Sequence, residues 1–314
     1  MLSHYNITKE EGITPCDKED GTWLVIQKAS QKELDDIIES YHLPADIFIS
    51  GDTAEEITHF ERMGNGKLGK LSILSLMNLC ADRTLPIEER LEPLIFVFAE
   101  DFTLTFIGDN SDFLEAFLEK YAKKITTAEK LCGYIIKLTY THYLKELIEI
   151  KKDIDDLDQA ARRTTENKEL FRLADTQRTM VYLDQTLQGQ KETLDYLWNE
   201  TDFPDRLDDE NLVYNIRLRQ AHAEERIVIY RDLLDTIGGL FNDMMDNHLN
   251  HLMKYLDSAA LVISFPALVS GIWGMNTGGL PGKESKIGFY LVMLLAIIVS
   301  IIVFLHLKRK DFSK

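Results

Sequence analysis

The feature that most constrains this chain is an uncharged apolar run near its C-terminus, from Ile287 to Leu307. At roughly 1.5 Å of helix per residue, a run of this length crosses a hydrocarbon core about 30 Å thick. The sequence therefore predicts a transmembrane helix at 287–307. The three residues that follow, Lys308, Arg309 and Lys310, are all cations. Short basic flanks stay on the cytoplasmic side of a membrane, so the tail 308–314 is predicted to be cytoplasmic.

A second apolar segment lies just upstream, from Ala259 to Trp273. It becomes long enough to span a membrane when it is extended to residues 255–275. Two spans would bracket an extracytoplasmic loop, 276–286. The N-terminal sequence MLSHYNITKE has neither the basic nor the apolar segment of a cleaved signal peptide. We therefore expect a multi-pass protein of the plasma (inner) membrane with both termini in the cytoplasm.

The charge of the chain limits its partners. The formal net charge is -17 and the pI is about 4.9. Such an acidic chain is a poor nucleic-acid binder and suits a protein that handles cations, although a solvated acidic cytoplasmic surface would explain the charge equally well. Its three cysteines, Cys16, Cys80 and Cys132, form neither a disulfide framework nor a CxxC pair. We expect reduced thiols, mostly buried.

Residues 1–121 have the pattern of a cytoplasmic α/β domain. Thr22 to Gln27 combines β-branched and aromatic residues, and Leu94 to Gly108 has the alternation of a hairpin. Between them, Ser30 and Glu33 are spaced as a capping box at a helix start.

Helical periodicity dominates the rest of the soluble part. Residues 122–200 predict two long antiparallel helices with a break near RRTTENKE. After the segment Thr201 to Asp205, a stalk helix at 206–254 continues into the first span. A helix that long cannot bury an apolar face alone and needs lateral partners. The expected fold is thus an α+β membrane protein with a helical stalk and two C-terminal transmembrane helices.

Motifs for catalysis are missing from the sequence. Gly64 to Ser72, GNGKLGKLS, approaches a P-loop, but Leu71 stands where a hydroxyl must ligate Mg²⁺. A turn before an apolar strand is the simpler interpretation. There is no HExxH, Gly-x-Ser-x-Gly or CxxC pattern, so we expect no enzyme and no cofactor. His248 and His251 could share a helix face for a soft divalent ion, or simply be two histidines at the inner membrane edge.

Small and polar residues recur along one side of the first span when it is read in steps of three and four. We call this set the polar stripe: Asn250, Met253, Asp257, Ala260, Ser264, Ala267 and Gly271. In a membrane, small residues permit close helix contact and polar ones face a bundle interior or a water-filled path. A helix-packing seam and a pore lining both fit the stripe. Asp257 favours the functional interpretation, because an ionisable group near hydrocarbon is costly.

The first span ends in Gly274, Met275 and Asn276. Carbonyl oxygens and a side-chain amide at a helix end are neutral oxygen ligands, which suit a hard cation such as Mg²⁺ that keeps its water. Gly-x-Asn also makes an ordinary helix C-cap, so the triplet alone is weak evidence.

The layout of the chain and two of its segments resemble the CorA family of divalent-cation transporters. GIWGMN closes the first of two C-terminal spans, and a stalk, two long helices and an α/β domain precede it. The most specific likeness lies in Gly274-Met275-Asn276 and in NHLNHLMK, Asn247 to Lys254. The layout is similar over essentially the whole chain.

The resemblance implies a funnel-shaped homopentamer whose first membrane helices line a pore. It implies that Gly274 and Asn276 bind the hydrated ion at the outer mouth. Asn250 would form a polar ring at the inner end, and Met253 with Leu256 an apolar constriction. The polar stripe contains Asn250 and Met253 but has Asp257 in place of Leu256. The stripe therefore places Asp257 toward the axis, whereas the resemblance places Leu256 there.

The identity of the ion stays open between two branches of that family. Its magnesium channels commonly carry acidic residues in the outer loop, whereas Thr277 to Lys286 holds one acid, Glu284, between Lys283 and Lys286. The loop Gly278-Gly279-Leu280-Pro281-Gly282 resembles the zinc-transporting ZntB branch instead. We expect Mg²⁺ uptake, with Zn²⁺ transport, with or without proton coupling, as the alternative. A membrane-tethered coiled-coil scaffold that conducts nothing is a third, more distant option.

Overall fold

The computed structural model describes residues 2–17, 21–44, 47–48, 58–66, 69–99, 102–163, 167–275, 279–280, 282 and 285–309. They fall into two compact units. The first comprises Met1–Ala160 and Glu166–Ile237, and the second comprises Ala161–Thr165 and Gly238–Lys314. Helix α7, Glu210–Trp273, contributes residues to both.

The first unit is built on a mixed sheet with the strand order β2-β1-β3-β7-β6-β5-β4. Its pairs are antiparallel except for β3 and β7, which run parallel. The strands are β1 Leu2–Thr8, β2 Gly12–Pro15, β3 Trp23–Gln27, β4 His59–Gly66, β5 Gly69–Leu79, β6 Leu91–Phe98 and β7 Thr103–Ile107.

Three local features predicted from the sequence are confirmed. Strand β3 falls within Thr22 to Gln27, and β6 and β7 form the predicted hairpin. At the start of α1, Gln31–Tyr41, the Glu33 amide donates to Ser30 Oγ and Glu33 Oε2 accepts from the Ser30 amide, which completes the capping box.

The P-loop-like segment GNGKLGKLS lies in a β-hairpin. Its first residues belong to β4 and its last to β5, and the two strands pair antiparallel with Gly66 opposite Gly69. A P-loop must lead into a helix whose N-terminus holds the phosphates. Here a strand follows instead, so the predicted apolar strand is confirmed, whereas Lys67 and Leu68, where the predicted turn falls, lie outside the described residues.

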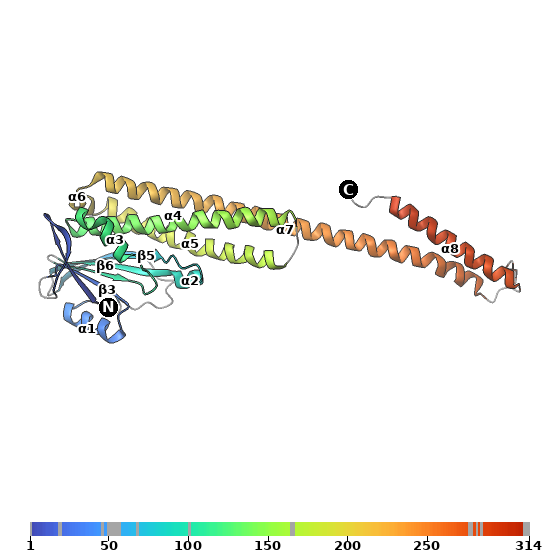
Figure 1. The fold of residues 1–314 in the computed structure, drawn as a ribbon, viewed down its shortest axis with the longest axis horizontal. Coiled ribbons are helices and arrows are strands. Elements are labelled where there is room, and N and C mark those ends of the chain that lie inside the picture. Colours follow the sequence, from blue (N-terminus) through green and yellow to red (C-terminus); the bar gives the residue numbers. More distant parts are fainter. Residues whose placement is uncertain are drawn as a thin grey trace. The chain divides into compact units, whose positions relative to one another are not determined.

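Each face of the sheet is covered by a different set of helices. On one face, Leu34 and Ile37 of α1 pack with residues from four strands. Those strand residues are Leu24, Ile26, Leu71, Ile73, Ile95, Val97, Leu104 and Phe106. On the other face, the Trp23 indole donates to Thr105 Oγ1 at 3.0 Å, and Tyr143 of α4, Ala128–Ala161, donates to the Met77 carbonyl at 2.8 Å. Figure 1 shows the sheet between α1 and the long helices.

Three long helices form a bundle beside the sheet: α4, α5 Asn167–Asn199, and the part of α7 within the first unit. Arg231 of α7 donates to Asp184 of α5 at 3.0 Å, and Lys191 of α5 donates to Glu224 of α7 at 2.7 Å. The shorter helices are α2 Ile87–Arg90, α3 Leu114–Tyr121 and α6 Phe203–Leu207. Cys80 and Cys132 are buried, and none of the three cysteines forms a disulfide.

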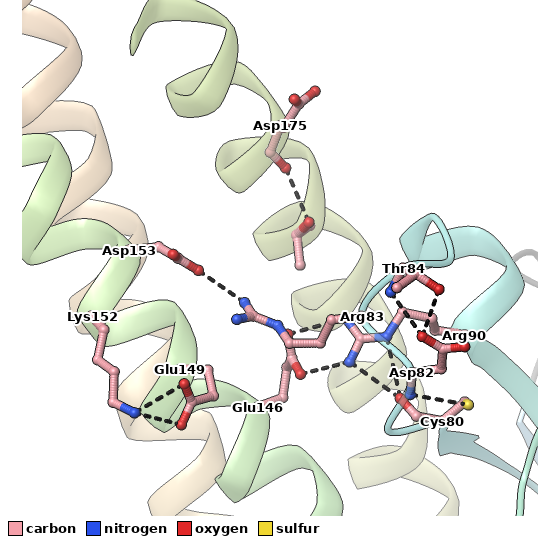
Figure 2. A network of polar contacts seen from close by, with 11 residues as sticks. Cys80, Asp82, Arg83, Thr84, Arg90, Glu146, Glu149, Lys152, Asp153 and Asp175 are labelled. Atoms are coloured by element: carbon pink, nitrogen blue, oxygen red, sulfur yellow. Dashed lines mark hydrogen bonds and ion pairs between the residues drawn. The ribbon is translucent and has the colours of Figure 1, made fainter. Parts of the chain in front are cut away.

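A buried ion pair ties the sheet to α4. Arg90 donates from Nη1 and Nη2 to the Glu146 carboxylate at 3.1 and 2.6 Å, and both side chains are nearly inaccessible. Arg90 also donates to the Cys80 carbonyl, and Arg83 joins Glu146 to Asp153. Figure 2 shows Arg83, from the connection between β5 and α2, and Arg90, the last residue of α2, converging on Glu146. Two planar guanidinium groups on one carboxylate make a strong, directional cluster.

We predict that Glu146→Gln destabilises the protein markedly, because it leaves the buried Arg90 charge without a counter-charge. Breaking a buried pair costs about 3 kcal/mol or more. For a unit of this size that corresponds to a fall in Tm of roughly 6–12 °C, measurable by scanning fluorimetry in detergent. Glu149→Gln is the matched control, since Glu149 pairs with Lys152 at the surface. Equal melting temperatures for the two variants would contradict the role given to Glu146.

A second polar chain joins α4 to the loop after β7. His142 Nδ1 lies 2.9 Å from Asn78 Oδ1, and the Asn78 amide nitrogen donates to Ser111 Oγ. Ser111 in turn donates to Glu92 at 2.7 Å. Because Asn78 uses its nitrogen on Ser111, its oxygen accepts, which assigns the Nδ1–H tautomer to His142. Burial, and secondarily Lys145, lowers the pKa of His142 from 6.5 to about 4.

The lowered pKa of His142 predicts a loss of stability in mild acid. Between about pH 6.5 and pH 4 the unfolded chain binds a proton at His142 that the folded protein excludes. The contribution of neutral His142 to the free energy of unfolding is therefore complete above about pH 6.5 and is lost as the pH falls toward 4. His142→Gln, whose amide can still donate to Asn78, should lose less stability than the wild type over this range. Parallel Tm curves for the two proteins would count against a neutral, buried His142.

Candidate functional site

The second unit contains the two predicted spans. By length and composition, two described helices could cross a membrane: α7, and α8 over Lys286–Leu307 of its full range Lys286–Arg309. The apolar part of α7 continues through Pro266 without a break in the helix. Proline is tolerated in membrane helices because neighbouring groups satisfy the carbonyl that it leaves without a donor.

Over the apolar part of α7, one face of the helix is less exposed than the rest. Besides Ser258, its half-buried side chains recur in steps of three and four, and we call them the α8-facing seam: Ala259, Val262, Pro266, Val269 and Trp273. On α8 the least exposed positions are likewise small, with Gly288 and Ala296 buried and Val292 half-buried. Small side chains allow close approach of two helices in a membrane.

The polar stripe lies on the opposite side of α7. At about 100° per residue, the mean direction of the stripe is roughly opposite that of the α8-facing seam. All of its members are exposed in the single chain: Asn250, Met253, Asp257, Ala260, Ser264, Ala267 and Gly271. The stripe is therefore not the surface on which the chain packs its own second span. Ser264 donates its hydroxyl to the Leu261 carbonyl at 2.9 Å, which leaves its oxygen lone pairs as acceptors.

The helix geometry bears on the choice between Leu256 and Asp257. Relative to the direction opposite the α8-facing seam, Asp257 lies within about 20° and Leu256 about 80° away. Both side chains are exposed. Tyr255 is 72% exposed, and aromatic residues favour the membrane interface. Asp257 lies two residues, or about 3 Å of helix, from Tyr255.

The described residues at the end of α7 include Gly274 and Met275, whereas Asn276 lies outside them. The Gly274 amide continues the helix by donating to the Ser270 carbonyl at 2.8 Å, and the Met275 amide donates to Ile272 at 3.3 Å. The ladder thus tightens from four-residue to three-residue steps at the end of the span. The last carbonyls of a helix have no partner within it, so they accept hydrogen bonds from groups beyond the helix.

The histidine pair belongs to no metal site formed by the described residues. His248 and His251 are exposed on α7. Over the part of the chain that the structure describes, no group of three or more His, Cys, Asp or Glu side chains could hold a metal ion. A soft-metal site at these histidines would therefore need ligands from outside the described residues.

A contact that the sequence analysis did not identify lies at the start of α8. Gly288 of α8 meets the backbone of Gly282, and Ser285 Oγ accepts from the Ile287 amide at 3.2 Å. The sequence signals were a serine directly before an apolar helix, and a glycine inside that helix. Neither signal identifies the partner across the turn.

Comparison with known proteins identifies the family. The family model described as "CorA-like Mg2+ transporter protein" matches residues 18–309. The chain belongs to this family. It is therefore a membrane protein with two apolar C-terminal helices, of a family of transporters rather than enzymes.

Individual relatives agree with this assignment. The cobalt/magnesium transport protein CorA of Methanocaldococcus jannaschii is 23% identical over 186 residues, which cover 58% of this chain and 57% of that protein. The match thus spans little more than half the length of this curated relative.

Two solved structures share the fold. The complete CorA magnesium transporter from M. jannaschii matches with a TM-score of 0.77 and 16% identity, covering 99% of this chain and 98% of that one. The ZntB cytoplasmic domain from Vibrio parahaemolyticus matches with a TM-score of 0.62 and 10% identity, covering 78% and 97%. At these identities the likeness establishes the architecture of an α/β domain, a long helix and two apolar C-terminal helices.

We predict that Ala296→Leu destabilises the pairing of α7 with α8. Ala296 is 6% exposed, and overpacking a filled contact costs roughly 1–3 kcal/mol. The melting temperature in detergent should fall by several degrees. Ile297→Leu serves as the control, because Ile297 is 51% exposed and faces away from the contact. A melting temperature for Ala296→Leu equal to that of the control would exclude the packing described for this face.

Proposed function

We propose that this protein is a CorA-type transporter that carries Mg²⁺ across the plasma membrane as a homopentamer. The observation that carries the proposal is the exposed polar stripe on α7 of a chain that belongs to the CorA-like family over residues 18–309. Asp257 and Ser264 lie within the predicted span 255–275 and are costly against lipid, so the stripe requires either a polar bundle interior or water.

Further copies of the same chain would supply that interior. When α8 lies on the outside of an assembly, the opposite side of α7 faces the centre, and the stripe of each copy lines a common axis. Closed rotational symmetry is the usual arrangement of identical subunits. The number five comes from the resemblance to the family. The lipid-facing surface is then α8, whose exposed side chains are almost all apolar.

Ion selection is proposed at the outer end of α7. Carbonyl oxygens near Gly274 and the Asn276 amide would hold the hydration shell of the ion, with Met275 setting their spacing. Mg²⁺ dehydrates reluctantly, so ligands that bind its water cost less than ligands that must replace it. A site of neutral oxygens also holds the ion weakly enough to release it, which conduction requires.

Passage and gating are assigned to the rest of the stripe together with its neighbour Leu256. Ser264 and Asn250 offer oxygen atoms to hydrated ions, and Met253 with Leu256 would close the inner end by excluding water. Asp257, at the inner boundary, would raise the local concentration of cations. An inside-negative potential of 100 mV gives a divalent ion about 4.6 kcal/mol, twice the value for a single charge, so the proposed transport needs no nucleotide and no bound cofactor.

The test is ion uptake by the purified protein in proteoliposomes, with Mg²⁺ and Zn²⁺ supplied separately under an inside-negative potential and without a pH gradient. We predict Mg²⁺ flux that Asn276→Ala abolishes while the oligomer stays assembled, because the variant removes only the amide. Asn215→Ala is the control, since its amide donates to the Asn211 carbonyl within the soluble part of α7. Full uptake by Asn276→Ala would refute the assigned ion site.

Zn²⁺ transport is the second candidate function, favoured by the glycine-rich loop from Gly278 to Gly282. In that case Zn²⁺ flux would appear only once a proton gradient is added, and Asp257 would be the next residue to change. Absence of flux for both ions would support the non-conducting scaffold instead.

A further inference from the structure

A cleft in the first unit opens beside the buried pair of Arg90 and Glu146. It has a volume of about 580 Å³, and it is lined by the connection between β5 and α2, by α2 itself, and by α4 and α5. Pockets of this size commonly hold small molecules. Figure 2 shows charged side chains from three of these elements: Arg83 on the connection, Asp153 on α4 and Asp175 on α5.

The charges that line the cleft do not cancel. The lining contains three arginines and four carboxylates, which leaves a formal net charge of -1. Three ion pairs account for six of these groups: Arg90 with Glu146, Arg83 with Asp153, and Arg178 with Glu88. The seventh group is the Asp175 carboxylate, which forms no ion pair with any residue that the structure describes. A ligand with one positive charge in the cleft would balance it.

The hydroxyl groups of the cleft are left as hydrogen-bond acceptors. A threonine hydroxyl has a single proton. Thr176 and Thr179 donate theirs to helix carbonyls four residues earlier, at 2.8 and 3.0 Å, and Thr84 donates to Asp82 Oδ1 at 2.7 Å. Their remaining lone pairs, together with the Asp175 carboxylate, favour a ligand that brings N–H or O–H donors.

Part of the lining is apolar. Leu85 and Pro86 come from the connection, Ile87 from the start of α2 and Ile150 from α4. Such side chains cannot ligate an ion, but they can cover hydrocarbon. A bare metal ion needs several ligand atoms, and among the described residues no group of three or more His, Cys, Asp or Glu side chains could hold one. These features together favour a cation that carries N–H donors and a hydrocarbon part.

We propose that this cleft binds a small aliphatic amine through one ammonium group. The ammonium forms an ion pair with Asp175 and donates its other protons to the hydroxyl oxygen atoms of Thr176 and Thr179. The methylene groups of the amine lie against Leu85 and Ile150, where they displace water from apolar surface. This site lies in the soluble unit, and its existence does not depend on the proposed transport.

The test is calorimetric titration of the purified full-length protein in detergent with the diamine putrescine, at an ionic strength that screens general attraction to an acidic surface. Saturable binding of one putrescine per chain is expected. Asp175→Asn should raise the Kd about tenfold, because it removes a hydrogen-bonded charge pair. Asp195→Asn is the matched control, since Asp195 is exposed on the same helix and does not line the cleft. Equal Kd values for the two variants would overturn the proposal.

Thr179→Val provides a second variant that leaves every charge in place. It should raise the Kd severalfold, the effect of losing one neutral hydrogen bond to the ligand. The same titration gives an answer if Asp175→Asn does not fold. An unchanged Kd in Thr179→Val would show that the ligand does not contact this part of α5 and would overturn the proposed site.

A comparison of ligands tests the chemical class. n-Butylamine should bind within severalfold of putrescine, because one ammonium group is sufficient, whereas ammonium chloride, which lacks the methylene groups, and 1-butanol, which lacks the charge, should bind far more weakly. Mg²⁺ is titrated separately against wild type and Asp175→Asn. Mg²⁺ binding that is tighter than putrescine binding and is weakened by Asp175→Asn would assign the cleft to a hydrated inorganic cation and would overturn the amine.

Discussion

The second unit is governed by the inability of hydrocarbon to supply hydrogen-bond partners. Every backbone group of a membrane span must be satisfied within the protein, which permits helices and excludes open strands. Each of the two helices satisfies its own backbone hydrogen bonds, so these bonds do not determine which sides of the helices are in contact. The side chains decide this, and Ala259, Val262 and Ala296 lie on the less exposed side of each helix. The opposite side of α7 is left with the polar groups.

The first unit is stabilised by a different kind of interaction. Its sheet is covered by helices on both faces, and apolar packing supplies most of the burial. The buried Arg90–Glu146 pair and the chain from His142 to Glu92 add directional bonds at two points of the contact between sheet and α4. Such bonds are poor sources of net stability, but breaking one partner is expensive. They therefore define how α4 sits on the sheet more sharply than apolar side chains alone would.

Much of this architecture could be predicted from periodicity. The spans, the long helices and the β6–β7 hairpin have strong patterns of their own, because each buries a regular face. Strand β1 has no such pattern, since all seven of its residues are half-buried and the sequence LSHYNIT mixes polar and apolar types. The Arg90–Glu146 pair and the contact between Gly282 and Gly288 join residues from different elements. Sequence spacing carries no information about such meetings.

The parallel pairing of β3 with β7 has a consequence for the order in which the chain folds. Trp23 lies opposite Thr103, so strands about 80 residues apart must meet at the centre of the sheet. Contacts between distant segments close slowly, because the loop entropy must be lost before they form. During synthesis, β7 emerges well before α8, and the soluble unit is complete at Ile237. All strands of the sheet have therefore left the ribosome, and can pair, while the apolar spans are still being synthesised. The slow pairing of β3 with β7 can then take place during synthesis, before the two apolar helices are present to interfere with it.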